Sequence, residues 1–77
     1  MTDLGFDGWA IEVRGSDEEF EYVDFFQNGD RVGTGRWMLD RADWAELPPA
    51  LSALSPTDAR ELTRRATDLM RSSPAKR

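Results

Sequence analysis

Alternation of apolar and polar side chains predicts three β-strands in the first half of the chain. In residues 9–14 every second side chain is apolar, which is the period of a half-buried strand. Residues 19–27 are rich in aromatic side chains, and residues 31–39 follow as a third strand. The dipeptide Asn28-Gly29 between them favours a two-residue hairpin turn, because both positions need a positive φ. We therefore expect a three-stranded antiparallel meander.

The two-residue turn also fixes the pairing of the second and third strands. Counting outward from the turn, Phe25 faces Val32 and Glu21 faces Arg36. A cross-strand ion pair such as the second contributes about 0.2–1 kcal/mol. The glycines of the third strand can instead mark a bulge, and a bulge would shift this register.

Helix signals occupy the second half of the chain. Asp40 is a candidate N-cap for a short helix through residue 47, which a proline pair then ends. Ser55-Pro56 is the clearest helix start, with serine as the cap and proline in the first turn. The apolar side chains that follow lie on one stripe of a helix that ends near residue 71: Ala59, Leu62, Ala66, Leu69 and Met70.

These elements predict one α+β domain, a three-stranded antiparallel meander followed by one short and one longer C-terminal helix. The domain spans residues 1–77, with residues 1–7 as a loose leader and residues 72–77 as a frayed tail. Eight apolar side chains should be largely buried: Ile11, Val13, Trp37, Leu47, Leu54, Leu62, Ala66 and Leu69.

The second strand is apolar on both faces, which a sheet with helices on one side does not require. Val23 and Phe25 lie on one face, and Phe20, Tyr22 and Phe26 lie on the other. An apolar face that the helices leave uncovered is typical of a partner site. A symmetric homodimer is the simplest cover for it, and the alternative is that the leader folds back over it.

The residue types present argue against most catalytic chemistry. The chain has no cysteine and no histidine, so it lacks disulfides, thiolate and imidazole metal ligands, and the commonest general base. Carboxylates and hydroxyls remain, but 77 residues leave little room for a substrate cleft. We expect no enzyme activity, no catalytic residue, no cofactor and no bound metal.

The net charge of −5 is unevenly distributed along the chain. Residues 1–30 hold nine acidic residues and one basic residue, whereas residues 55–77 hold three acidic and six basic residues. The overall charge should repel nucleic acid. The amino terminus has no signal-peptide pattern, and no apolar run reaches the ~18 residues of a membrane span. We expect a cytoplasmic protein that binds another protein, with no membrane partner, and the charge disfavours nucleic acid as the partner.

An acidic surface is the main candidate for the contact with that partner. Its members lie in and after a turn predicted at residues 15–18, between the first two strands: Asp17, Glu18, Glu19, Glu21 and Asp24. Such a surface can imitate a phosphate backbone, which would make the chain an inhibitor or regulator of the kind that phages and mobile elements often encode. The alternative is a charged turn with a solvated strand face that protects a sheet edge. Two aromatic residues complete the candidate site, Tyr22 on the sheet and Trp44, which lies either at a helix–sheet seam or in the binding surface.

Two other binding functions remain open. The aromatic sheet face would suit a structural or dimerising accessory module. The basic face of the last helix would suit a nucleic-acid binder, and its members are Arg60, Arg64, Arg65, Arg71, Lys76 and Arg77. Glu61 and Asp68 lie at pairing distance from these arginines on the same helix, which favours an ordinary charged surface.

Overall fold

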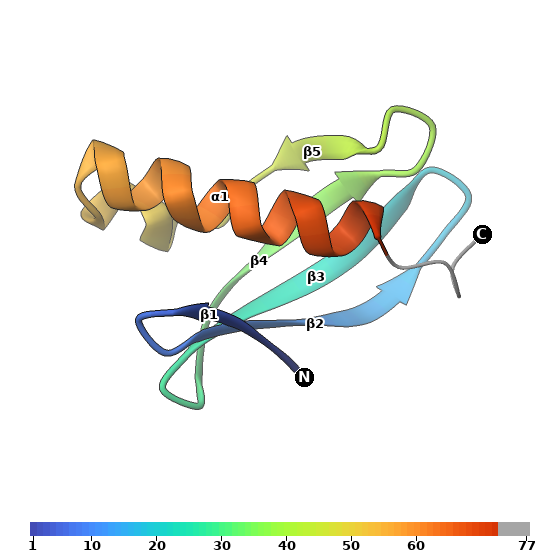
Figure 1. The fold of residues 1–77 in the computed structure, drawn as a ribbon. Coiled ribbons are helices and arrows are strands. Elements are labelled where there is room, and N and C mark those ends of the chain that lie inside the picture. Colours follow the sequence, from blue (N-terminus) through green and yellow to red (C-terminus); the bar gives the residue numbers. More distant parts are fainter. Residues whose placement is uncertain (73–77) are drawn as a thin grey trace.

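The computed structural model describes residues 1–72 as a curved antiparallel sheet crossed by one long helix (Figure 1). In this part of the chain the sheet has five strands in sequence order: β1 (Thr2–Phe6), β2 (Trp9–Ser16), β3 (Phe20–Gln27), β4 (Asp30–Met38) and β5 (Asp43–Glu46). A 3-10 turn, η1 (Pro49–Ala53), leads into α1 (Pro56–Arg71). We call the sheet face under α1 the inner face and the opposite one the open face.

The α+β class is confirmed, but the predicted three-stranded meander with two helices is wrong. Residues 1–72 form five strands and a single α-helix, which is not long and apolar enough to cross a membrane. The additional strands, β1 and β5, lie where the sequence predicted a loose leader (1–7) and a short helix (40–47). The later helix is confirmed, and the Ser55 hydroxyl accepts a hydrogen bond from the Asp58 N–H at 3.1 Å. Apart from Ser72, the predicted tail lies outside the described residues.

The first strand, β1, forms because Asp7 and Gly8 turn the chain tightly back into β2. Both residues have a positive φ, 50° and 78°, as a two-residue hairpin turn requires. Leu4 is buried in the core under α1, and the Arg65 guanidinium donates hydrogen bonds to the carbonyl oxygens of Leu4 (3.1 Å) and Gly5 (3.0 Å). The leader therefore extends the sheet at its edge and does not fold over the open face.

The last strand, β5, replaces the predicted short helix because Trp44 packs into the sheet. Its ring centre lies 4.9 Å from that of Trp37 and 5.5 Å from that of Phe25. Asp40 caps no helix but lies in a turn that ends at Ala42, which has a φ of 53°. Four residues are then enough for a strand, although they are too few for a stable helix.

The register of β3 against β4 differs from the prediction by one residue. A bulge at Val32 gives β4 one extra residue just after the turn. The predicted pairs Phe25–Val32 and Glu21–Arg36 are therefore wrong. The observed pairs are Phe25 with Gly33, and Glu21 with Trp37.

The same bulge turns Gly33 and Gly35 towards the inner face, where the chain after β5 crosses them. A Cβ atom on Gly33 would lie 2.6 Å from the Cβ of Pro48, and one on Gly35 would lie 2.9 Å from the backbone oxygen of Glu46. Glycine in a strand allows this close approach of another segment. The crossing carries the chain to the inner face, where η1 and α1 pack.

The core fills the space between the inner face and α1. Trp9, Phe25, Trp37 and Leu62 are its largest buried side chains. Of the eight side chains predicted to be buried, four are buried, and the other four pack partly exposed against the core: Val13, Leu47, Leu54 and Leu69.

Gly35→Ala should lower the free energy of unfolding by about 1–3 kcal/mol, because its methyl group would overlap the Glu46 carbonyl. Gly15→Ala in β2 is the matched control, since no atom lies within 4 Å of a Cβ there. This control should leave the free energy unchanged or raise it by up to about 1 kcal/mol. Chemical denaturation followed by tryptophan fluorescence measures both, and equal effects would contradict the close crossing over β4.

Candidate functional site

The fold divides the predicted acidic surface among three environments. Asp17, Glu18 and Glu19 are exposed in the β2–β3 turn. Glu21 is buried on the inner face, and Asp24 is buried on the open face, because neighbouring positions of β3 alternate between faces. The five carboxylates therefore do not form one continuous surface.

Asp17 holds the β2–β3 turn together. Its Oδ1 accepts hydrogen bonds from the backbone N–H groups of Glu19 (2.9 Å) and Phe20 (2.8 Å), and its Oδ2 accepts one from the Tyr22 hydroxyl (2.7 Å). The Tyr22 hydroxyl and then these backbone donors lower the pKa of Asp17. The same bond to the carboxylate raises the pKa of Tyr22. Both residues are thus part of the turn's own hydrogen-bond network.

Asp24 is the centre of a polar network on the open face. Arg14 donates to both carboxylate oxygens (2.8 and 3.1 Å), the Thr34 hydroxyl donates to Oδ1 (2.7 Å), and Arg31 lies 4.0 Å from Oδ2. Burial opposes the ionisation of Asp24, but the hydrogen bonds from Arg14 and Thr34 and the two arginine charges outweigh it and lower its pKa. The hydrogen bond to Asp24 raises the pKa of Arg14 in turn. This network stabilises the ionised carboxylate and binds β2, β3 and β4 together.

Glu21 is an anomaly in the inner face. It faces Trp37 across the β3–β4 ladder, its residue surface is 3% exposed, and its Oε1 has no hydrogen-bond partner. Buried polar atoms in folded proteins almost always have one, and an unsatisfied atom costs about 1–3 kcal/mol. Glu21 therefore lies away from any surface contact, and its unsatisfied oxygen is expected to lower the stability of the core.

Trp44 lies at the seam between the sheet and α1. Its ring packs on Trp37 and Phe25, and its indole N–H donates to the Thr67 hydroxyl of α1 at 2.9 Å. The ring remains half-buried. The sequence left open whether Trp44 lies at a helix–sheet seam or in the binding surface, and in the structure it lies at the seam.

The acidic turn borders an apolar hollow at one end of the open face, which we call the slot. The slot has a volume of about 340 Å³ and lies between the β2–β3 and β4–β5 turns. Phe20 and Met38, directly opposite each other on β3 and β4, are its apolar part. The residues that line it are Glu18, Glu19, Phe20, Met38, Asp40 and Arg41.

The charges around the slot are only partly neutralised. The Glu18, Glu19 and Asp40 side chains make no hydrogen bond or ion pair within residues 1–72. The guanidinium of Arg36 lies 5.0 Å from the centre of the Phe20 ring, so one cation already stacks beside the slot. Sequence reasoning missed Met38 and Asp40, because only the strand register and the β4–β5 turn bring them beside Phe20.

The basic face of α1 is largely engaged in contacts within the chain. Arg64 pairs with Glu61 (2.6 Å) and Asp68 (3.2 Å), and Arg65 also binds Glu61 (2.6 Å). The hydrogen bonds from Arg64 and Arg65 lower the pKa of Glu61, and the bond to Glu61 raises the pKa of Arg64. Arg71 donates to the Ala42 carbonyl oxygen at 3.0 Å. The predicted contributions of Lys76 and Arg77 lie outside the described residues.

Residues 1–72 contain no group of three or more acidic side chains placed to hold a metal ion. The chain matches no known protein-family model, no curated protein and no solved structure. The geometry of the open face is therefore the basis for any functional proposal.

Asp24→Asn should lower the free energy of unfolding by about 1–3 kcal/mol at neutral pH, because the amide loses the charge that Arg14 and Thr34 stabilise. The pKa of Asp24 is lowered in the folded state, so its stabilisation is present above the ordinary value near 3.9. It is lost as the pH falls through the lower folded-state value. Denaturation curves at several pH values should show the difference from wild type shrinking below about pH 4. The control Asp30→Asn changes an exposed carboxylate at the first residue of β4 and should produce no such difference.

Glu21→Met should raise the free energy of unfolding by about 1–3 kcal/mol, because it replaces an unsatisfied buried oxygen with an apolar chain of similar length. The matched control, Glu19→Met, changes an exposed position and should stay within about 0.5 kcal/mol. Thermal and chemical denaturation of both variants test this. A Glu21→Met protein less stable than wild type would show that the carboxylate supports the core.

Proposed function

We propose that this protein is a binding module that recognises a basic surface of another protein through the slot. The observation that carries this proposal is the excess of acidic over basic groups around an apolar pair. Phe20 and Met38 lie beside three acids, Glu18, Glu19 and Asp40, and one base, Arg41. Aromatic and methionine side chains are enriched in protein interfaces. A lysine or arginine of the partner would lay its aliphatic stem on the apolar part and direct its charge to the acidic rim.

The charge balance of the chain supports a protein partner over nucleic acid. The half of the molecule that carries the slot's acidic turn is strongly negative, since residues 1–30 hold nine acidic residues and one basic residue. The arginines of α1, which would have to meet a phosphate backbone, are mostly tied to Glu61, Asp68 and backbone oxygens. Negative charge around the slot would also speed encounter with a basic partner.

Inhibition or regulation of the partner is the function that such a small module would have. The absence of cysteine and histidine from the chain supports action by binding and not by catalysis. Imitation of a nucleic acid would depend on Glu18, Glu19 and Asp40, because Asp24 is neutralised by arginines and Glu21 faces the core. The identity of the captured partner decides between these forms of the proposal.

The double variant Glu18→Lys/Glu19→Lys should weaken binding of the partner about tenfold, mainly through a slower association rate, because exposed charges at an interface act mostly on encounter. Tagged full-length protein would capture the partner from the native host, and mass spectrometry would identify it. Surface plasmon resonance at two salt concentrations would then give the rates. Asp17 is kept in this variant, because its replacement would disturb the turn.

Two controls separate the slot from general charge effects. Asp30→Lys makes half the charge change of the acidic double variant, at the opposite end of β3, and it should change affinity much less than half as much on a logarithmic scale. The variant Arg60→Glu/Arg64→Glu should leave binding intact. If this variant abolishes binding while the acidic double variant binds normally, the partner contacts α1 and the proposal is wrong.

A further inference from the structure

We propose that the free edge of β2 binds an extended, basic segment of a partner protein by strand addition, at a site separate from the slot. β2 continues to Ser16, but β1 pairs with it only as far as Ile11, which faces Thr2. On that side the backbone from Glu12 to Ser16 lies beside no other strand of residues 1–72. The N–H and C=O groups of such an edge are available to pair with an added strand, on either side of an irregularity between Val13 and Gly15.

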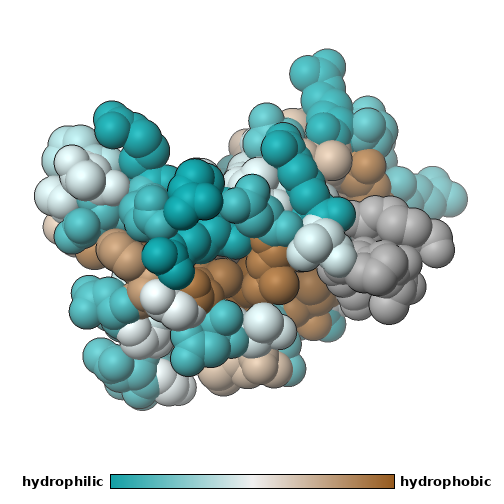
Figure 2. Space-filling model, viewed as in Figure 1, coloured by the Kyte–Doolittle hydropathy of each residue, from teal (hydrophilic) through white to brown (hydrophobic). Residues whose placement is uncertain are grey.

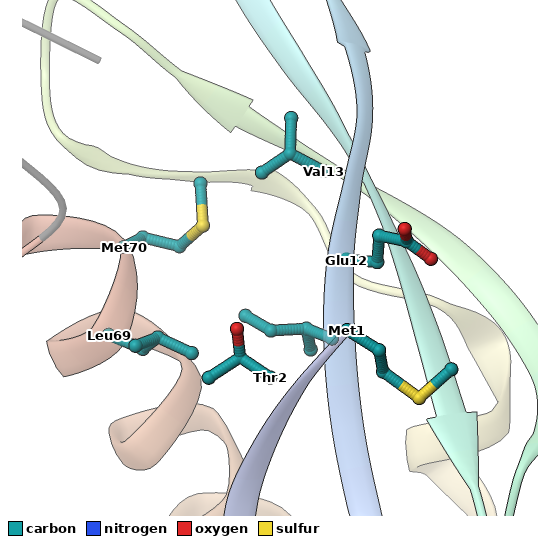
Figure 3. A pocket seen from close by; sticks show the side chains of 7 residues that line it. Met1, Thr2, Glu12, Val13, Leu69 and Met70 are labelled. Carbon is teal, nitrogen blue, oxygen red and sulfur yellow. The ribbon is translucent and has the colours of Figure 1, made fainter. Parts of the chain in front are cut away.

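An apolar hollow opens beside this edge. It has a volume of about 260 Å³ and lies between the start of β1, the middle of β2 and the end of α1. Figure 2 shows a hydrophobic band between α1 and the β1–β2 side of the molecule. In Figure 3, Val13 of β2 and Leu69 and Met70 of α1 point towards the hollow.

The hollow and the edge fit one extended segment. Val13 of β2 and Leu69 of α1 are apolar but remain partly exposed. Both line the hollow beside the part of β2 that no other strand pairs with on this side. On an added strand, the residue opposite Val13 would point to the same side of the sheet, because directly opposed side chains share a face. An apolar side chain at that position would enter the hollow while the backbone pairs with β2.

The charges along the edge select a basic segment. Glu12 lies on the opposite side of β2 from Val13 (Figure 3), faces Asp24 across the β2–β3 ladder, and has no cationic partner within residues 1–72. The acidic turn Asp17–Glu19 flanks the other end of the edge. Arg14, the one base between them, is held by Asp24.

A second copy of the chain is a poorer occupant by the same reasoning. Two copies could pair antiparallel along this edge, centred between Arg14 and Gly15. That pairing would bring Glu12 of each copy opposite Asp17 of the other. Like charges at directly opposed positions are destabilising, so the edge favours a basic partner over itself.

A blocked seven-residue peptide of alternating valine and lysine is the probe for this site. Added to the 15N-labelled full-length protein, it should shift the amide signals of residues 12–16 saturably and slow their hydrogen exchange. A peptide of alternating valine and glutamate should bind at least about fivefold more weakly, because it meets Glu12 and the acidic turn with like charge.

Point variants show whether the binding depends on the edge. Glu12→Lys should weaken binding of the lysine peptide by up to about fivefold, and Asp30→Lys, with the same change in net charge, by less than about twofold. Val13→Thr should also weaken it, because a hydroxyl then enters the hollow. Met38→Ala in the slot should leave the peptide affinity unchanged, so that failure of the slot and failure of the edge are distinguishable.

Three results would overturn the proposal. Equal weakening by Glu12→Lys and Asp30→Lys would show general charge attraction without a site. Amide shifts confined to the slot would place the peptide there. Protection of residues 12–16 that rises with protein concentration in the absence of peptide, together with a dimer in sedimentation equilibrium, would identify a second copy as the occupant.

Discussion

The arrangement of the whole molecule depends on two positions of β4 that carry no side chain. Gly33 and Gly35 let Pro48 and the carbonyl of Glu46 lie directly against the inner face. The bulge at Val32 is what turns both glycines to that side, because an unbroken ladder would point them to the open face. The crossing they allow delivers η1 and α1 to one face, so this local contact also decides which face of the sheet stays uncovered.

The sequence predicted the elements whose signals are local and strong. The Asn28-Gly29 turn, the alternation in residues 9–14 and the cap at Ser55 each reflect one backbone requirement, and each recurs in the structure. The strands β1 and β5 were not predicted, because the residues that stabilise them lie elsewhere in the chain. Leu4 needs α1 to bury it, and Trp44 needs Trp37, so the contacts that stabilise each strand are not local. The local signals available for β1 were the short alternation of Leu4 and Phe6 and the turn dipeptide Asp7-Gly8.

The candidate site was predictable to the same extent. The exposed turn Asp17–Glu19 and the aromatic strand after it were visible in the sequence, and they do border the slot. Glu21 and Asp24 are three positions apart, so strand alternation already places them on opposite faces of the sheet. Only the packing of the inner face shows that Glu21 is buried against Trp37. Met38 lies in the slot because of the strand register, and Asp40 lies there because of the β4–β5 turn. The one-residue bulge shifts that register, and the sequence did not predict where the bulge lies.

The proposal of a binding function depends on the division between satisfied and unsatisfied charges. Asp24 and Glu61 are held by arginines, and Asp17 by the donors of its own turn, so these acids stabilise the structure. Some of the carboxylates without partners lie beside the two hollows, Glu18 at the slot and Glu12 at the β2 edge, whereas Asp30 at the start of β4 lies beside neither. A small domain has a thin stability margin, and solvent-exposed acids that pair with nothing add little to it. The acids that do line the hollows, Glu12, Glu18, Glu19 and Asp40, are the ones that a basic partner of the kind proposed above would pair with.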